Sequence, residues 1–283
     1  MVLLTFAWGF THVATKLAAN DVSFVLQGGI RQCIALACLF GWALWRGIPL
    51  FARDGTGGPG LVAGTLFAGE MFFIYAGLAY TGASRMVVFI YFAPVLTAVG
   101  VHLVVPGERL NKWQWLGILA SFAGILVAFG EGFLAAPAAL LGDVCGVLAA
   151  IFWAATTVVV RATRLTHSTA TKVLFYQLAV SAVLLVPASF AMGEAGVVRL
   201  STLAIASLAY QGAIVSFATY LAWFWLLTRY LAGRLSVFSF LAPLFGVISG
   251  VLVLGEPLRP AFAFAVVLVG CGIVLVNLKP PRQ

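Results

Sequence analysis

Charged residues are what this sequence has least of. Asp, Glu, Lys and Arg make up only 8% of its 283 residues, whereas a water-soluble domain carries about a quarter. Hydrophobic residues make up 63%, and the mean hydropathy is +1.10. Such a chain has too little polar surface to cover a soluble globule. The composition therefore excludes a soluble enzyme, a nucleic-acid-binding domain and a disordered chain, and it predicts an integral membrane protein in contact with the lipid bilayer.

Motifs for metal binding and catalysis are also missing. The four cysteines lie inside apolar runs, with neither metal-ligand spacing nor a disulfide framework. There is no HExxH helix, no P-loop and no Gly-x-Ser-x-Gly turn. We therefore expect no metal, no cofactor, no enzymatic activity and no ATP-driven transport by this chain. No basic start precedes the first apolar run, so no cleavable signal peptide is expected.

What the sequence has instead is long, unbroken apolar runs. A membrane-spanning helix needs about 20 apolar residues, and a β-barrel strand would show alternating apolar and polar residues. We predict an all-α membrane protein with ten transmembrane helices. Their expected ranges are 3–17, 22–45, 61–80, 85–105, 112–129, 139–160, 172–190, 203–227, 235–254 and 260–276. Residues 130–137 (GEGFLAAP) form the break between halves.

The basic residues orient these helices, because Lys and Arg collect in cytoplasmic loops. With the N-terminus inside, the inner side carries most of them: Arg46, Arg53, Arg109, Lys112, Arg161, Arg164, Lys172, Arg229, Arg234, Lys279 and Arg282. The outer side carries only Lys16, Arg85, Arg199 and Arg259. We therefore predict that both termini are cytoplasmic. The net charge of +8 reflects this bias rather than a nucleic-acid partner.

The second half of the sequence repeats the first. Residues 5–16 (TFAWGFTHVATK) match residues 150–161 (AIFWAATTVVVR), and residues 81–110 match residues 230–258. The matched pairs include Trp8 with Trp153, Arg85 with Arg234, Phe89 with Phe238, Pro94 with Pro243, and Glu108 with Glu256. Each half holds an odd number of helices, so we predict two units, 1–130 and 131–283, with the second inverted in the membrane. Inverted repeats are typical of secondary transporters, with the substrate site between the halves.

The repeated features also carry a family resemblance. They are Trp8, Trp153, the two stretches from Arg to Ala-Pro, and the two Gly-Glu-x-Leu turns. On these residues the chain resembles the EamA family of the drug/metabolite transporter superfamily over nearly its whole length. Within that family it looks most like ten-helix amino-acid and metabolite exporters of the aromatic amino acid exporter type. The resemblance implies a multi-pass protein of the bacterial cytoplasmic (inner) membrane, with a cavity lined mostly by helices other than the fifth and tenth.

Two charges are predicted to lie deep in the membrane. Glu70 lies about ten residues into the third predicted helix, so about 15 Å deep. Arg31 lies at a similar depth in the second. An intramembrane ionisable group is by default a candidate functional residue. Two readings stay open: a buried Arg31–Glu70 ion pair that only stabilises the fold, or a substrate or proton site at Glu70.

Polar and aromatic residues share a helix face in both halves. His12 lies one turn from Trp8, and its repeat equivalent Thr157 lies one turn from Trp153. A lone histidine is as often a packing residue as a functional one. Because the repeat places two such faces opposite each other, these four residues are cavity candidates.

The two prolines define a second set of candidates. Pro94 and Pro243 cannot donate to the carbonyls of Ile90 and Ser239. The prolines either kink the helix for packing or act as paired hinges beside a cavity. On the second reading, the residues near these breaks are cavity candidates: Tyr91, Phe238 and Ser239.

Aromatic residues of the third and eighth helices complete the predicted site. Membrane aromatics usually serve packing or the interfacial belt. Tyr220 and Trp223 lie too deep for a belt, and Phe73, which matches Ala222 in the repeat, is the aromatic candidate of the third helix. Glu108 and Glu256, at the starts of the fifth and tenth helices, are given a structural role because a carboxylate favours the positive helix end. Gly142-x-x-x-Gly146 and Gly246-x-x-x-Gly250 are assigned to packing.

These features predict a secondary transporter whose substrate is a small molecule. An aromatic cavity with few charges suits an amino acid or a related amphipathic metabolite better than a phosphorylated sugar, and export is the expected direction. Other readings stay open: a sugar, nucleotide-sugar or cationic-drug transporter, a channel, or an intramembrane enzyme. A channel would show filter loops or charge rings, which are not visible.

Overall fold

The computed structural model describes residues 1–81, 86, 89–129, 140–254 and 260–277. The predicted break at 130–137 lies outside these residues, as do Arg85 and Glu256. The described part is helical apart from turns and a single isolated β-bridge between Val22 and Val197. The predicted all-α class is therefore confirmed for the described residues.

The helices follow the predicted apolar runs closely. In the first half they are α1 (Val2–Ala18), α2 (Phe24–Trp45), α3 (Gly57–Gly77), α5 (Ala93–Val104) and α6 (Lys112–Phe129). In the second half they are α8 (Leu140–Ala162), α9 (Ala170–Ala191), α10 (Thr202–Ala209), α11 (Tyr220–Leu227), α12 (Ala232–Ser236), α13 (Leu241–Leu254) and α14 (Pro260–Asn277). Shorter elements are η2 (Arg164–His167), η3 (Tyr210–Thr219) and η4 (Val237–Phe240).

Five of the helical stretches are long and apolar enough to cross a membrane. They are Phe24–Trp45, Gly57–Gly77, Leu140–Ala162, Ala170–Ala191 and Thr202–Leu227. Five shorter apolar stretches lie at the positions of the other predicted spans: Val2–Thr15, Ala93–Val104, Lys112–Val127, Ala232–Gly246 and Phe264–Asn277. The composition and these helices together support a membrane protein.

A π-helix interrupts the predicted eighth helix. Instead of one α-helix over 203–227, α10 leads into the ten-residue π-helical η3, which leads into α11. The i→i+5 bonding of a π-helix is rare, and it is frequently found at functional sites. It brings residues five apart to the same side, and Gln211 and Ser216 accordingly both hydrogen-bond to side chains of α2.

The two Ala-Pro sequences mark breaks in the fourth and ninth predicted helices. Residues 91–92 form a turn, and α5 begins at Ala93, so Pro94 lies in its first helical turn. The 3₁₀ segment η4 likewise ends at Phe240, and Pro243 lies in the first turn of α13. Proline is tolerated at these positions because first-turn amides have no intrahelical acceptor. Each predicted continuous helix is thus divided at equivalent places.

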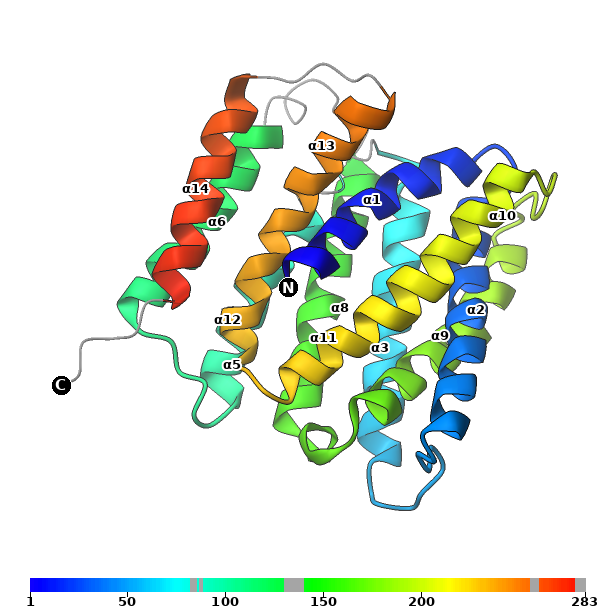
Figure 1. Cartoon of the computed structure of the whole chain (residues 1–283), viewed down its shortest axis with the longest axis horizontal. Helices are drawn as coiled ribbons and strands as arrows, with labels where there is room; N and C mark the ends of the chain where they lie inside the picture. The colour runs from blue at the N-terminus through cyan, green and yellow to red at the C-terminus, as the bar shows by residue number, and fades with distance from the viewer. Residues whose placement is uncertain (82–85, 87–88, 130–139, 255–259, 278–283) are drawn as a thin grey trace.

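Helix packing follows the same pattern in both halves (Figure 1). Helix α1 packs on α13 as α8 packs on α5, and α3 packs on α8 as α10 and η3 pack on α1. Helices α2 and α9 pack on each other. Helices α6 and α14 form a pair along one side of the bundle, away from α2 and α9. The centre is therefore surrounded by the helices other than α6 and α14.

Close contact between α1 and α13 depends on glycine. A Cβ atom at Gly9 would lie 2.7 Å from the backbone nitrogen of Gly246 and would also overlap the carbonyl of Ala242. Small residues let membrane helices approach at backbone distance. The packing role predicted for Gly246 is supported; the packing around Gly250 is not described.

A buried ion pair connects the loop between α5 and α6 to α8, α11 and α12 at one end of the bundle. Glu108 Oε1 accepts from Arg161 Nε at 2.5 Å, and Glu108 Oε2 accepts from the Ala232 amide at 2.7 Å. A second guanidinium nitrogen of Arg161 donates to the Leu227 carbonyl at 2.5 Å. We call these four residues the Glu108 cluster. Glu108 was expected to place its carboxylate at the N-terminus of the fifth predicted helix, which is α6. This is wrong, because the carboxylate lies at the N-terminus of α12 instead.

The loop between α2 and α3 lies at the same end of the bundle (Figure 1), and a second ion pair holds it there. Lys172 Nζ lies 2.7 Å from Asp54 Oδ2 and 2.7 Å from the Ala52 carbonyl. Thr56 Oγ1 donates to Asp54 at 2.5 Å. The hydrogen bonds from Lys172 and Thr56 hold the pKa of the Asp54 carboxyl well below its ordinary value. Asp54 therefore stays ionised at physiological pH and fixes this loop to α9.

Candidate functional site

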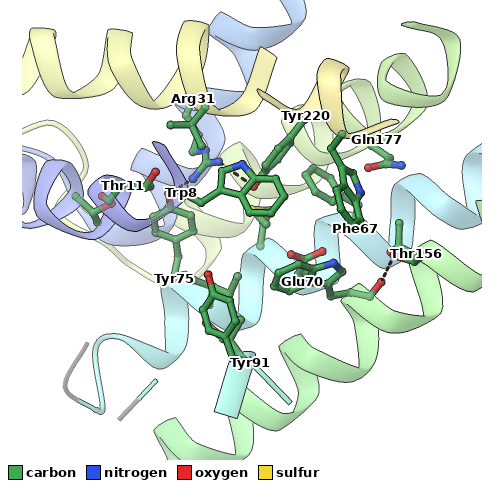
Figure 2. Close-up of a pocket in the computed structure, with 18 of the residues that line it drawn as sticks. Trp8, Thr11, Arg31, Phe67, Glu70, Tyr75, Tyr91, Thr156, Gln177 and Tyr220 are labelled. Atoms are coloured by element: carbon green, nitrogen blue, oxygen red, sulfur yellow. Dashed lines mark hydrogen bonds between the residues drawn. The ribbon is translucent and has the colours of Figure 1, made fainter. Parts of the chain in front are cut away.

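A cavity of about 120 Å³ lies at the centre of the helices (Figure 2). It is lined by side chains from α1, α2 and α3 of the first half and from α8, α9, η3 and α11 of the second. Ile90 and Tyr91, next to the break before Pro94, also line it. None of the described lining residues belongs to α6 or α14.

Aromatic rings form much of the wall. The Trp8 indole makes edge contacts with the rings of Trp153, Tyr220 and Trp223, at centroid distances of 6.4, 6.1 and 5.7 Å. Tyr91 contacts Trp153 in the same way at 6.0 Å. Trp8 Nε1 also donates to a hydroxyl of η3, that of Thr219, at 2.8 Å. The two predicted faces, one from each half, thus meet in one aromatic cluster.

Arg31 anchors a polar network beside these rings. Its guanidinium donates to Ser216 Oγ at 2.7 Å, to the Tyr75 hydroxyl at 2.8 Å and to the Tyr220 hydroxyl at 3.2 Å. Tyr75 in turn donates to Gln211 Oε1 at 3.2 Å. The π-helical winding of η3 supplies Gln211 and Ser216 to this network. Arg31 is thereby fixed in position, with only 4% of its surface exposed.

The predicted ion pair between Arg31 and Glu70 is not formed. Three neutral hydroxyl groups surround Arg31 instead, and among the described residues Glu70 makes no hydrogen bond or ion pair. Both residues line the cavity, and Glu70 is 6% exposed. The similar depth predicted for the two side chains does not imply contact, because Tyr75 and Tyr220 occupy the space around the guanidinium.

The other predicted site residues divide into three groups. The cavity brings together seven of them: Trp8, Glu70, Tyr91, Trp153, Thr157, Tyr220 and Trp223. Three lie elsewhere: Phe73 packs on Phe152 at 5.5 Å, Phe238 packs against a hydrophobic core, and Ser239 is fully buried in η4. The side chain of His12 is not described. Sequence alone misplaced Phe238 and Ser239 because it did not predict the 3₁₀ turn.

Several residues line the cavity although no sequence pattern predicted them there. They are Thr11, Thr15, Phe67, Met71, Ile74, Tyr75, Leu78, Ile90, Thr156, Gln177, Val215 and Phe224. The signal for Gln177 was available, since it is a polar amide in the middle of an apolar run. Its side-chain nitrogen and oxygen are buried without a hydrogen-bond partner in the described part of the chain.

Comparison with known proteins gives the family of this site. The model of the EamA-like transporter family matches residues 1–130 and 140–278. The chain belongs to the EamA-like transporter family. An uncharacterized transporter of Bacillus subtilis (strain 168), YoaV, is 24% identical over 285 residues, covering 100% of this chain and 97% of the relative. A probable amino-acid metabolite efflux pump of Escherichia coli (strain K12) is 24% identical over 283 residues, covering 97% and 92%.

A solved crystal structure of another protein has the same fold as this EamA-like chain. It superposes with a TM-score of 0.83 at 22% sequence identity, and the match covers 98% of both chains. Family and relatives indicate a transporter rather than an enzyme. With the apolar helices, they identify a multi-pass integral membrane protein of the inner membrane.

Proposed function

We propose that this EamA-like protein is a secondary transporter that exports amino acids or related small amphipathic metabolites through its central cavity. The observation that carries the proposal is the cavity itself, which lies between the two halves and is lined by both. Transporters built from inverted repeats hold their substrate at that interface. Two relatives named probable amino-acid metabolite efflux pumps favour this class of substrate.

The size and chemistry of the cavity favour a small amphipathic solute. A cavity of about 120 Å³ is close to the roughly 150 Å³ of an engineered cavity that binds benzene. Its wall combines indole and phenol rings with one buried arginine and one buried glutamate. A phosphorylated sugar would require several buried cations, and Arg31 is the only described Lys or Arg that lines the cavity.

We also propose ten membrane spans in two inverted five-helix repeats, with both termini in the cytoplasm. The exchange of packing partners between the halves supports this arrangement, since α1–α13 corresponds to α8–α5. In this orientation the Glu108 cluster and the Lys172–Asp54 pair lie at the cytoplasmic end. The helix breaks before Pro94 and Pro243 are the proposed hinges of an alternating-access movement.

Transport by the purified protein in proteoliposomes tests the function. We expect saturable movement of one or more amino acids from a panel of phenylalanine, leucine, threonine, lysine and glutamate. A sugar phosphate and a quaternary ammonium drug serve as competing substrate classes. Movement of only those two would contradict amino-acid transport, and unsaturable, voltage-driven conductance would indicate a channel. The Pro94→Ala, Pro243→Ala double variant is expected to transport more slowly while binding remains, because alanine, unlike proline, permits a continuous and stiffer helix through each break.

Single-cysteine labelling tests the topology. In a background without the four native cysteines, Gln283→Cys and Arg53→Cys should react only from the cytoplasmic side and Glu131→Cys only from the outside. This follows from the distribution of basic residues and the odd number of helices in each half. Labelling of the two termini from opposite sides, or a nine-helix map, would contradict the proposal.

A further inference from the structure

We infer that the cavity binds its solute as a zwitterion, with Arg31 receiving a carboxylate and Glu70 receiving an ammonium group. The inference rests on the proposed function and narrows its substrate class. It starts from two buried ionisable side chains, one basic and one acidic, that line one cavity without contacting each other.

Arg31 has the properties of an anion-binding group that is already held in place. Its three hydrogen bonds go to the neutral hydroxyls of Ser216, Tyr75 and Tyr220, and none goes to a carboxylate. Arginine remains protonated in proteins, and its guanidinium has more N–H groups than these three bonds use. A buried cation with no counter-ion is costly unless an anion joins it. The remaining donors suit a carboxylate entering from the cavity.

Glu70 presents the complementary group. Its side chain lines the cavity from α3, and it has no hydrogen-bond or ion-pair partner among the described residues. The Arg31 charge acts on it electrostatically. Figure 2 shows the two side chains on different sides of the drawn site, with the Trp8 indole between them in this view. A zwitterionic solute pairs with both groups at once, whereas a purely cationic or anionic solute pairs with only one of them.

The surroundings define the rest of the solute. Gln177 lines the cavity from α9 with an amide that is fully buried and unpartnered in the described chain, so it offers a further hydrogen bond. The rings of Trp8, Trp153 and Trp223 form an apolar wall. The chemistry that fits is a zwitterionic head with an apolar or aromatic side chain.

Ligand analogues that remove one charge at a time test the inference. The probes are phenylalanine, its amide, which is only cationic, and N-acetylphenylalanine, which is only anionic. Binding is measured on the purified full-length protein by ligand-induced thermal stabilisation and tryptophan fluorescence, and transport in proteoliposomes. We expect wild type to bind phenylalanine about tenfold or more tightly than either analogue, as loss of one charge-assisted hydrogen bond implies.

Each variant should erase one preference and keep the other. In Glu70→Gln the advantage of phenylalanine over N-acetylphenylalanine should fall below about twofold, while its advantage over the amide remains. Arg31→Gln should do the reverse. Because the hydroxyls around Arg31 lose their donor in that variant, Arg31→Lys is included, and it should preserve the preference for a carboxylate. Arg199→Gln removes an exposed charge outside the cavity and should leave both preferences unchanged.

Three outcomes would overturn the inference. They are equal binding of the three probes by wild type, an equal loss for all three probes in Glu70→Gln, and binding or transport confined to a purely cationic or anionic solute of the transport panel. In the last case the transporter function stands and only the zwitterion site fails. If wild type moves none of the solutes, the proposed function itself fails, and the inference fails with it.

Discussion

Replacing Arg161 with glutamine is expected to lower the free energy of unfolding by about 3–5 kcal/mol, the cost of leaving a buried carboxylate unpaired. The Glu108 side chain is only 2% exposed, and Arg161 supplies its counter-ion at 2.5 Å. The same guanidinium holds the carbonyl of Leu227 at the end of α11. The variant therefore loses both the ion pair and the hydrogen bond that connects α8 to α11. Thermal unfolding in detergent, followed by circular dichroism, measures the change.

The double variant Glu108→Gln, Arg161→Gln separates charge burial from geometry. With both charges removed, most of the lost stability should return, because a neutral amide costs far less to bury than an unpaired carboxylate. A matched control is Arg164→Gln, three residues further along the chain. If Arg161→Gln unfolds at the wild-type temperature, the pair contributes nothing to stability.

Replacing Trp8 with alanine is expected to reduce transport by about tenfold or more. Edge contacts between aromatic rings contribute about 0.5–1.5 kcal/mol each, and Trp8 contacts the rings of Trp153, Tyr220 and Trp223. The variant also removes a ring of the cavity wall against which an apolar solute would pack, and a tenfold effect corresponds to about 1.4 kcal/mol of lost solute binding. The hydrogen bond to Thr219 is lost as well. Initial rates in proteoliposomes at equal amounts of inserted protein measure the effect.

Trp113→Ala is the matched control, because Trp113 lies on α6 with 48% of its surface exposed and does not line the cavity. It should transport at close to the wild-type rate. Trp8→Phe should fall between the two, since it keeps a ring but loses the indole donor. Equal losses in Trp8→Ala and Trp113→Ala would remove the case for the aromatic cavity.

Much of the fold was predictable because bilayer thickness fixes helix length. The apolar runs gave the helices to within a few residues, as at 112–129, where α6 has the same bounds. The aromatic site was partly predictable for a similar reason: the repeat pairs Trp8 with Trp153, and their rings meet in the cavity. Phe238 and Ser239 were assigned to the cavity because a continuous helix was expected where the structure has a 3₁₀ turn.

The sequence by itself determined that this is a helical membrane protein of the EamA type, since charge content, run length and the repeated Arg-to-Ala-Pro stretches are properties of the chain alone. Only the tertiary structure decided how its buried charges are used. Arg31 and Glu70 are predicted to lie at matching depths, yet hydroxyls from α3, η3 and α11 surround the guanidinium, and Glu70 lines the cavity without contacting it. Depth along a helix is set by residue number, whereas contact between helices depends on the π-helical winding of η3 and on the side chains between them, which no single run of sequence specifies.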